Sequence, residues 1–160
     1  MVAAAAALVQ KVARLSGQQW PESAAVHDRA ERIRVRSEEL VEQDSVAYLD
    51  FVAAARSGDG VEAARAKTVE VPLEIARHAA EVYRLAQVVE EKGNPRLRAD
   101  AVVARILAAA AAESAALLVE VNLGLESDDE RLVEARRLAG AATARGSSSE
   151  SGDSQRRARR

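Results

Sequence analysis

The sequence of 160 residues contains no cysteine, and only 2% of its residues are aromatic. Without a thiol, the chain can form no disulfide and carry out no thiolate chemistry. Glycine and proline are also scarce, at eight and three residues. The remainder is rich in alanine, leucine, valine, arginine and glutamate, a composition typical of long helices. The length predicts a single domain.

Neither sign of charge dominates, because 23 lysines and arginines stand beside 25 aspartates and glutamates and the net charge is −2. This balance gives no argument for a nucleic-acid partner. Long apolar runs are missing too. Residues 3–9 are too few to span a bilayer and lack the preceding basic residues of a signal peptide, and residues 106–119 are interrupted by Glu113. We therefore expect a cytoplasmic protein with no membrane segment.

Several well-known functional motifs are also missing. The sequence has no Walker loop, no Rossmann glycine fingerprint and no nucleophile elbow. His27 and His78 lie far apart, on or beside polar faces, without the spacing of metal ligands. We expect both histidines to be solvated and no metal to be bound.

Apolar residues recur at helical spacing along most of the chain and predict an all-α fold. Capping residues, glycines and prolines divide it into about five to six helices, expected to pack as an antiparallel bundle. The first four helices are predicted at about residues 2–16, 23–56, 61–70 and 72–92. The break before Pro72 is predicted because proline disfavours a helical residue before it. The first helix has no capping residue, which indicates that its first turns are missing.

Gly93-Asn94-Pro95 predicts a tight turn: glycine suits a left-handed residue, asparagine caps the next helix and proline opens it. The helix that follows, to about residue 123, is apolar nearly all round and is expected at the centre. A capping box at residues 127–130 predicts the last helix, to about residue 144. Residues 1–144 thus form one helical domain, and the glycine-, serine- and arginine-rich residues 145–160 are predicted to be a disordered tail. Because alanine buries little area, we expect the domain to oligomerise.

Asp44 interrupts the apolar stripe of the second helix. It falls on the inward face four residues after Leu40 and seven before Phe51, on the stripe that also carries Tyr48. A carboxylate there is costly unless it is used or paired. Asp44 is therefore either a general acid/base, kept reactive near neutral pH by burial, or one half of a buried ion pair with a neighbouring helix.

Three further polar residues have two interpretations each. Asp100 lies in the first turn of the long apolar helix, where an acid favours the helix dipole and could also meet a ligand. Asn122 lies at the other end of that helix and either caps it or binds a ligand. Lys67 either is solvated or faces an anionic ligand.

Six sequence segments resemble a known family in their residues, their order and their separation. They are A-L-V-Q-K-V-A-R-L-S at residues 7–16, L-V-E-Q-D-S-V-A-Y at 40–48, V-P-L-E-I-A at 71–76, Gly93-Asn94, D-A-V-V-A at 100–104, and Asn122-Leu123 with a downstream Asp128. Together they resemble the cyclodeaminase/cyclohydrolase family. This family includes the cyclodeaminase half of formiminotransferase-cyclodeaminase and bacterial methenyltetrahydrofolate cyclohydrolases. The resemblance runs from the first helix to about residue 144.

The resemblance implies an all-helical homodimer acting on a one-carbon derivative of tetrahydrofolate, with no other cofactor. The position of the family's catalytic acid is Asp44. The residues that match its binding positions are Asn94, Asp100 and Asn122, and Lys67 is the candidate for the substrate's glutamate tail. The reaction implied is that of a methenyltetrahydrofolate cyclohydrolase or a formiminotetrahydrofolate cyclodeaminase.

The sequence also departs from the family's pattern. The family begins with a glycine-rich Pro-Gly-Gly-Gly-Ser segment that is not found here, so we expect either a start further upstream or a shortened family member. Ala99 replaces a serine, and Leu118 replaces an asparagine. The alternative function is therefore a non-catalytic helical dimer of the same family that acts as a scaffold or interaction protein.

Overall fold

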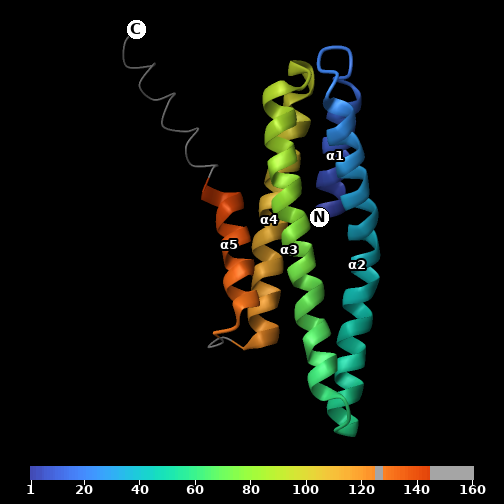
Figure 1. Ribbon diagram of the computed structural model, residues 1–160, viewed down its shortest axis with the longest axis vertical. Helices are drawn as coiled ribbons and strands as arrows, with labels where there is room; N and C mark the ends of the chain where they lie inside the picture. The colour runs from blue at the N-terminus through green and yellow to red at the C-terminus, as the bar shows by residue number, and fades with distance from the viewer. Residues whose placement is uncertain (125–127, 145–160) are drawn as a thin grey trace, which may run out of the picture.

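The computed structural model describes residues 1–124 and 128–144. These residues form five α-helices and one short 3₁₀ helix, with no strand among them (Figure 1). The helices are α1 (Val2–Arg14), α2 (Ser23–Ser57), α3 (Val61–Lys92), η1 (Pro95–Leu97), α4 (Arg98–Leu123) and α5 (Glu130–Ala144). The prediction of an all-α chain with about five to six helices is confirmed. The predicted tail, residues 145–160, lies outside the described residues.

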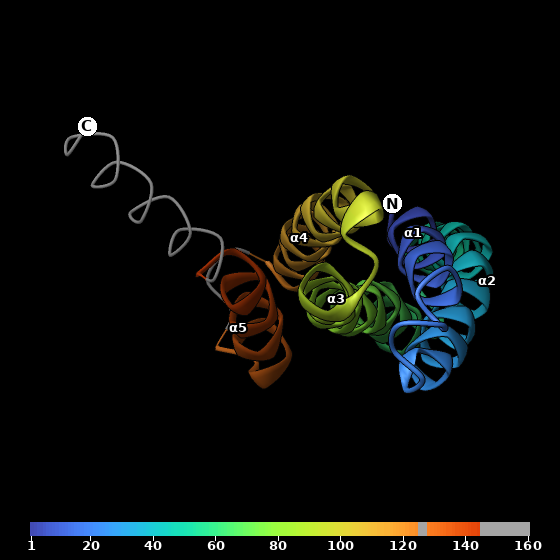
Figure 2. The same ribbon diagram turned by 90° about the horizontal axis from the view of Figure 1, so that it is seen from above.

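The helix at the centre is α3, and not α4 as the sequence predicted. Viewed from above, α3 lies between α4 and α2, with α5 on its outer side (Figure 2). It contacts each of the other four α-helices. One face of α4 packs against its neighbours through small residues, Ala101, Ala104, Ala108, Ala111, Ala112, Ala115 and Ala116. The opposite face is open: Val103, Ile106, Leu117 and Val121 are between 46% and 59% exposed.

The open apolar face of α4 raises the question of whether this helix crosses a membrane. Residues Pro95–Leu123 are long and apolar enough to cross a membrane by length and composition alone, and 39% of the relevant window is buried. Core helices also satisfy these criteria. The alanine face of α4 packs into the main core with Val9 and Val12 of α1 and Val82 and Val89 of α3.

The predicted helix break before Pro72 is wrong, because α3 continues from Val61 to Lys92 with Pro72 inside it. Proline has no N–H, so it cannot donate to the carbonyl of Thr68 four residues earlier. The side-chain amide of Asn122, from α4, donates to that carbonyl instead (2.5 Å). A long-range hydrogen bond that the local sequence does not reveal thus helps the helix to pass through proline.

The turn between α3 and η1 forms where it was predicted, but glycine has a different role there. Gly93 has φ −76°, so it is not left-handed. A Cβ on Gly93 would lie 2.4 Å from the carbonyl oxygen of Val89 and 3.0 Å from Val12. Asn94 caps η1 as predicted, accepting from the N–H of Arg96 (3.0 Å). Glycine is required here because a side chain would overlap the Val89 carbonyl of α3 and crowd α1.

Other helix ends follow capping rules. Gly58 ends α2 in the left-handed conformation (φ 79°), and α1 begins without a side-chain cap, both as predicted. The start of α5 is capped by Asp129, whose side chain accepts from the N–H of Arg131 (2.8 Å). Hydrogen bonding from Arg131 lowers the pKa of Asp129 to about 2. Ser127, the predicted start, lies outside the described residues.

Candidate active site

Asp44 is half-buried, so the prediction that it is buried is wrong. Among the described residues, the buried polar side chains are Ser16, Ser23, Ser37 and Thr68, and none is charged. The reason is the length of α1. Its 13 residues extend about 20 Å, whereas Asp44 lies about 32 Å along α2 from Ser23. Helix α1 therefore runs beside only the first part of α2 and does not reach the level of Asp44; Figure 1 shows the N-terminus part-way along α2.

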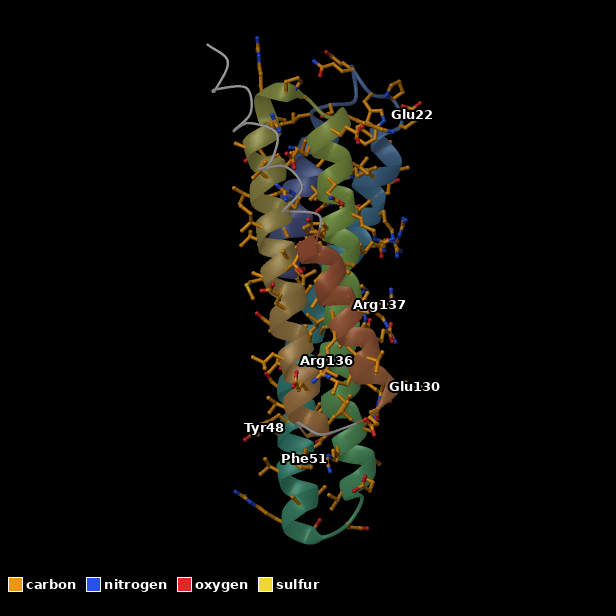
Figure 3. All side chains as sticks on the ribbon, turned by 90° about the vertical axis from the view of Figure 1, so that its left-hand side faces the viewer. Glu22, Tyr48, Phe51, Glu130, Arg136 and Arg137 are labelled. Atoms are coloured by element: carbon orange, nitrogen blue, oxygen red, sulfur yellow. The ribbon has the colours of Figure 1, made fainter. Side chains whose placement is uncertain are left out.

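The aromatic residues beyond Asp44 are uncovered for the same reason. Tyr48 is 63% exposed and Phe51 is half-buried. Both lie in the lower half of the molecule, on the part of α2 beyond α1 (Figure 3). Asp44 makes no ion pair or hydrogen bond with the described residues, so the buried ion pair considered from the sequence does not form within this chain.

A cleft of about 640 Å³ lies between α2 and α3. Its volume falls in the range that accommodates a drug-sized ligand. Lys67 lines it, as does Arg36, but Asp44 does not. The carboxylates on its walls are Glu39, Glu42, Asp50, Glu70 and Glu74. Lys67 thus lies in a cleft in which acidic groups outnumber basic ones.

Ion pairs join α2 and α3 both at this cleft and outside it. Arg36 of α2 donates two hydrogen bonds to Glu74 of α3 (2.7 and 2.9 Å), and Arg29 donates two to Glu81 (2.6 and 2.7 Å). These hydrogen bonds lower the pKa values of both glutamates. The face of α3 that carries Glu74 and Glu81 is therefore an interface with α2.

His78 lies between these two pairs in the sequence of α3 and is half-buried rather than solvated. Its Nδ1 atom is buried without a hydrogen-bond partner among the described residues. Burial lowers the pKa of His78, so the imidazole is held neutral. The i, i+4 and i+7 spacing of Glu74, His78 and Glu81, which places them on one helix face, could have indicated a shared polar interface.

Three of the predicted binding residues make structural contacts. The N–H of Asn94 donates to the buried hydroxyl of Ser16 (2.8 Å), and its side chain caps η1. Asp100 pairs with Lys11 of α1 (2.8 Å). The amide of Asn122 donates to Thr68, as described above. Asp100 and Asn122 are also about 33 Å apart along α4, farther than one cleft of ligand size extends.

A group of possible metal ligands occurs elsewhere on α2. His27, Asp28 and Glu31 place one ligand atom each within 4.8 Å of the others, on an accessible turn. His27 already contacts Asp28 (3.3 Å). Exposed groups of this kind are common without an ion, and we assign no function to it.

Comparison with known proteins decides the family. The model of the formiminotransferase-cyclodeaminase family matches residues 1–139. The chain belongs to this family. All five predicted site residues, Asp44, Lys67, Asn94, Asp100 and Asn122, lie within the matched region, which extends into α5.

A solved structure supports the fold of this formiminotransferase-cyclodeaminase family member. The structure of formiminotetrahydrofolate cyclodeaminase from Thermotoga maritima superposes with a TM-score of 0.78, covering 88% of this chain and 79% of that chain. The two sequences are 24% identical, so this likeness concerns the fold alone. No curated protein matches the sequence significantly.

Proposed function

We propose that this chain is an enzyme of folate one-carbon metabolism, a formiminotetrahydrofolate cyclodeaminase or a methenyltetrahydrofolate cyclohydrolase. The observation that carries the proposal is the family match over residues 1–139. It is supported by the partner-free carboxylate of Asp44 on the accessible part of α2. The substrate is a one-carbon derivative of tetrahydrofolate, and we expect no other cofactor.

Asp44 is the general acid/base of this proposal. In cyclodeamination, the aniline nitrogen of the folate attacks the formimino carbon, and a tetrahedral carbon joins the two folate nitrogens. Asp44 takes the proton from the attacking nitrogen and returns it to the departing ammonia. In cyclohydrolysis, water adds to the methenyl carbon, and Asp44 takes its proton before one carbon–nitrogen bond breaks. One such group typically contributes about 10²–10⁴-fold to the rate.

Positioning of the substrate must supply the rest of the acceleration. Lys67 is the candidate for the glutamate tail, since the other cation of the α2–α3 cleft, Arg36, is already paired with Glu74. Asn94, Asp100 and Asn122 are the candidates for the pterin ring. Asp100 and Asn122 are about 33 Å apart along α4, so one chain cannot place all three on one substrate.

A second copy of the chain would resolve this separation. The open apolar face of α4 runs along the whole helix, from Val103 to Val121. If two copies pack these faces in opposite directions, Asp100 of one copy approaches Asn122 of the other. We therefore propose a homodimer in which both copies contribute to each site.

The alternative, a non-catalytic scaffold of the same family, also rests on specific contacts. Asn94, Asp100 and Asn122 each have a structural partner, and these contacts would persist without any substrate. Asp44 is accessible, as an ordinary surface carboxylate would be. The scaffold keeps the helical dimer and lacks the reaction.

Two assays separate these possibilities. The purified chain is mixed with methenyltetrahydrofolate, and the loss of its absorbance is compared with the loss in buffer. A parallel reaction with formiminotetrahydrofolate follows the release of ammonia. Acceleration of the first reaction alone indicates a cyclohydrolase, and ammonia release indicates a cyclodeaminase. If the folded, helical protein matches buffer in both assays, the enzyme proposal is wrong and the scaffold is favoured.

A further inference from the structure

A second cavity lies between α3 and α5, lined by residues that are neither in the α2–α3 cleft nor among the predicted site residues. Its volume is about 340 Å³. Its polar lining consists of Tyr83, Arg84 and Gln87 from α3 and Arg137 from α5. The other lining residues are alanines and one leucine, and no carboxylate is among them. Two arginines from different helices therefore border one small cavity without an acid.

The carboxylates that could neutralise these arginines are engaged elsewhere. Glu81, three residues before Arg84, accepts two hydrogen bonds from Arg29 (2.6 and 2.7 Å). Glu134, three residues before Arg137, accepts two from Arg77 (2.8 and 2.7 Å). Neither Arg84 nor Arg137 has an ion pair with the described residues.

The contrast with the adjacent arginine is informative. Arg136 and Arg137 are consecutive on α5 (Figure 3). Arg136 pairs with Glu120 of α4 (2.9 Å), whereas Arg137 borders the cavity. Many other arginines of α2–α5 that reach a neighbouring helix have a carboxylate partner, as in the Arg29–Glu81, Arg36–Glu74 and Arg77–Glu134 pairs. The cavity is therefore bordered by two guanidinium groups that form no direct ion pair with the described residues, although Glu81 and Glu134 lie near enough for their pKa values to be lowered further by Arg84 and Arg137.

Tyr83 adds a buried donor to the lining. The residue is 2% exposed, and its hydroxyl makes no hydrogen bond of good geometry with the described residues. Arg105 approaches it from α4, and this contact raises the pKa of Arg105. An arginine cannot accept a proton from the phenol, so the hydroxyl still lacks an acceptor. Leaving a buried donor without an acceptor is unfavourable.

We propose that this cavity binds a small polyanion carrying phosphate or carboxylate groups. The anion bridges Arg84 and Arg137, and an oxygen atom accepts from the hydroxyl of Tyr83. Guanidinium groups suit this ligand class because their planar donors match the oxygens of phosphate and carboxylate. The proposal is independent of the folate reaction.

Binding would also have a mechanical consequence. Arg84 and Arg137 repel each other across the cavity, since both carry positive charge. A bound anion turns this repulsion into an attraction and holds α5 more firmly against α3. We therefore expect slower backbone hydrogen exchange in α5 and a higher melting temperature when the anion is bound.

The test uses the full chain with tripolyphosphate and citrate as probes, titrated at constant ionic strength in an isothermal calorimeter. The two probes distinguish phosphate from carboxylate as the preferred group. We expect saturable binding of at least one, weakened about tenfold or more by Arg84→Gln and by Arg137→Gln. Arg32→Gln removes the same charge from an exposed arginine of α2 and should change nothing.

Hydrogen exchange gives a second measurement on the same variants. Protection of α5 by the probe should disappear in Arg84→Gln and Arg137→Gln and persist in Arg32→Gln. Circular dichroism confirms that each variant is folded. The proposal is overturned if neither probe shows saturable binding, or if all three variants respond as the wild type does. Either outcome leaves the folate proposal untouched, because none of these residues belongs to it.

Discussion

Residue 72 shows how one distant side chain can compensate for a local defect. Proline removes a backbone donor from the interior of α3, and this leaves the carbonyl of Thr68 without its usual partner. Asn122 supplies the donor from α4, and Thr68 is 7% exposed, so water has little access to the site. The same asparagine was predicted to contact the substrate. One N–H of its amide is engaged in this bond, so any substrate contact is left to the second N–H and the side-chain oxygen.

A double-mutant cycle tests this structural role. Replacing Asn122 with alanine leaves the Thr68 carbonyl unsatisfied, and we expect a loss of about 1–3 kcal/mol in the free energy of unfolding. In a Pro72→Ala background, the restored N–H can donate to Thr68, so the same substitution should cost less than half as much. Denaturant unfolding of the four proteins measures both costs. Equal costs in the two backgrounds would show that Asn122 does not compensate for the proline.

At the scale of helices, the molecule depends on close approach and on paired charges. Gly93, in the turn after α3, has no room for a side chain because the Val89 carbonyl of α3 and Val12 of α1 both lie too close. The hydroxyl of Ser16 joins the same two elements, donating to Val12 and accepting from Asn94. Along α2 and α3, paired arginines and glutamates enclose the half-buried His78.

The first prediction at this scale concerns two glycines. Gly93→Ala should destabilise the protein by about 1–3 kcal/mol, because the new Cβ overlaps a carbonyl of α3 and crowds α1. Gly140 is the matched control, since it lies inside α5 and a Cβ there meets nothing within 4 Å. Gly140→Ala should stabilise by about 0.5–1 kcal/mol, because alanine favours the helix. Thermal and denaturant unfolding measure both effects, and similar losses in the two variants would contradict the packing argument.

The second prediction at this scale concerns pH. Burial lowers the pKa of His78 below its ordinary value of 6.5. On acidification the unfolded chain therefore binds this proton first, and stability falls as the pH drops below about 6.5. The lowered pKa values of Glu74 and Glu81 act in the same direction, but below their ordinary value of 4.5. His78→Gln should flatten the decrease between pH 7 and 5.

Histidine 27 provides the control for this pH effect. Unfolding free energies are measured across the pH range for the wild type, His78→Gln and His27→Gln. His27 contacts Asp28 (3.3 Å) on α2, and its substitution should leave the contribution of His78 in place. A profile that is the same in all three proteins would show that His78 is not the titrating group.

At the scale of the whole molecule, local features could be predicted from the sequence. The open face of α4 and other features that depend on packing between distant helices could not. Helix periodicity and caps located α2 and the turns at Gly58 and Gly93, because these signals are local. Pattern alone placed Asp44 on an inward face but could not show that α1 ends before reaching it. It also gave α4 an apolar surface nearly all round, which the single chain leaves half uncovered. Contacts between distant helices, such as Asn122 with Thr68, lie beyond what one sequence reveals.

The open face also predicts the assembly. Ile106 and Leu117 are each 58% exposed on α4. Ile106→Glu and Leu117→Glu should convert the proposed dimer to a monomer, since each buries a charge in an apolar interface. Val133→Glu is the control, because Val133 is 62% exposed on α5. Sedimentation velocity reports the outcome, and a wild type that is monomeric at micromolar concentration would contradict the dimer.

The central claim is that Asp44 carries a proton in folate chemistry. The most direct measurement is the turnover rate of Asp44→Asn beside the wild type, on whichever folate substrate the wild type consumes. Asp28→Asn, an exposed aspartate on the same helix, is the control. We expect Asp44→Asn to lose about 10²–10⁴-fold in turnover while remaining folded, and Asp28→Asn to match the wild type. If Asp44→Asn retains the wild-type rate, Asp44 is not the acid/base and the proposed mechanism is wrong.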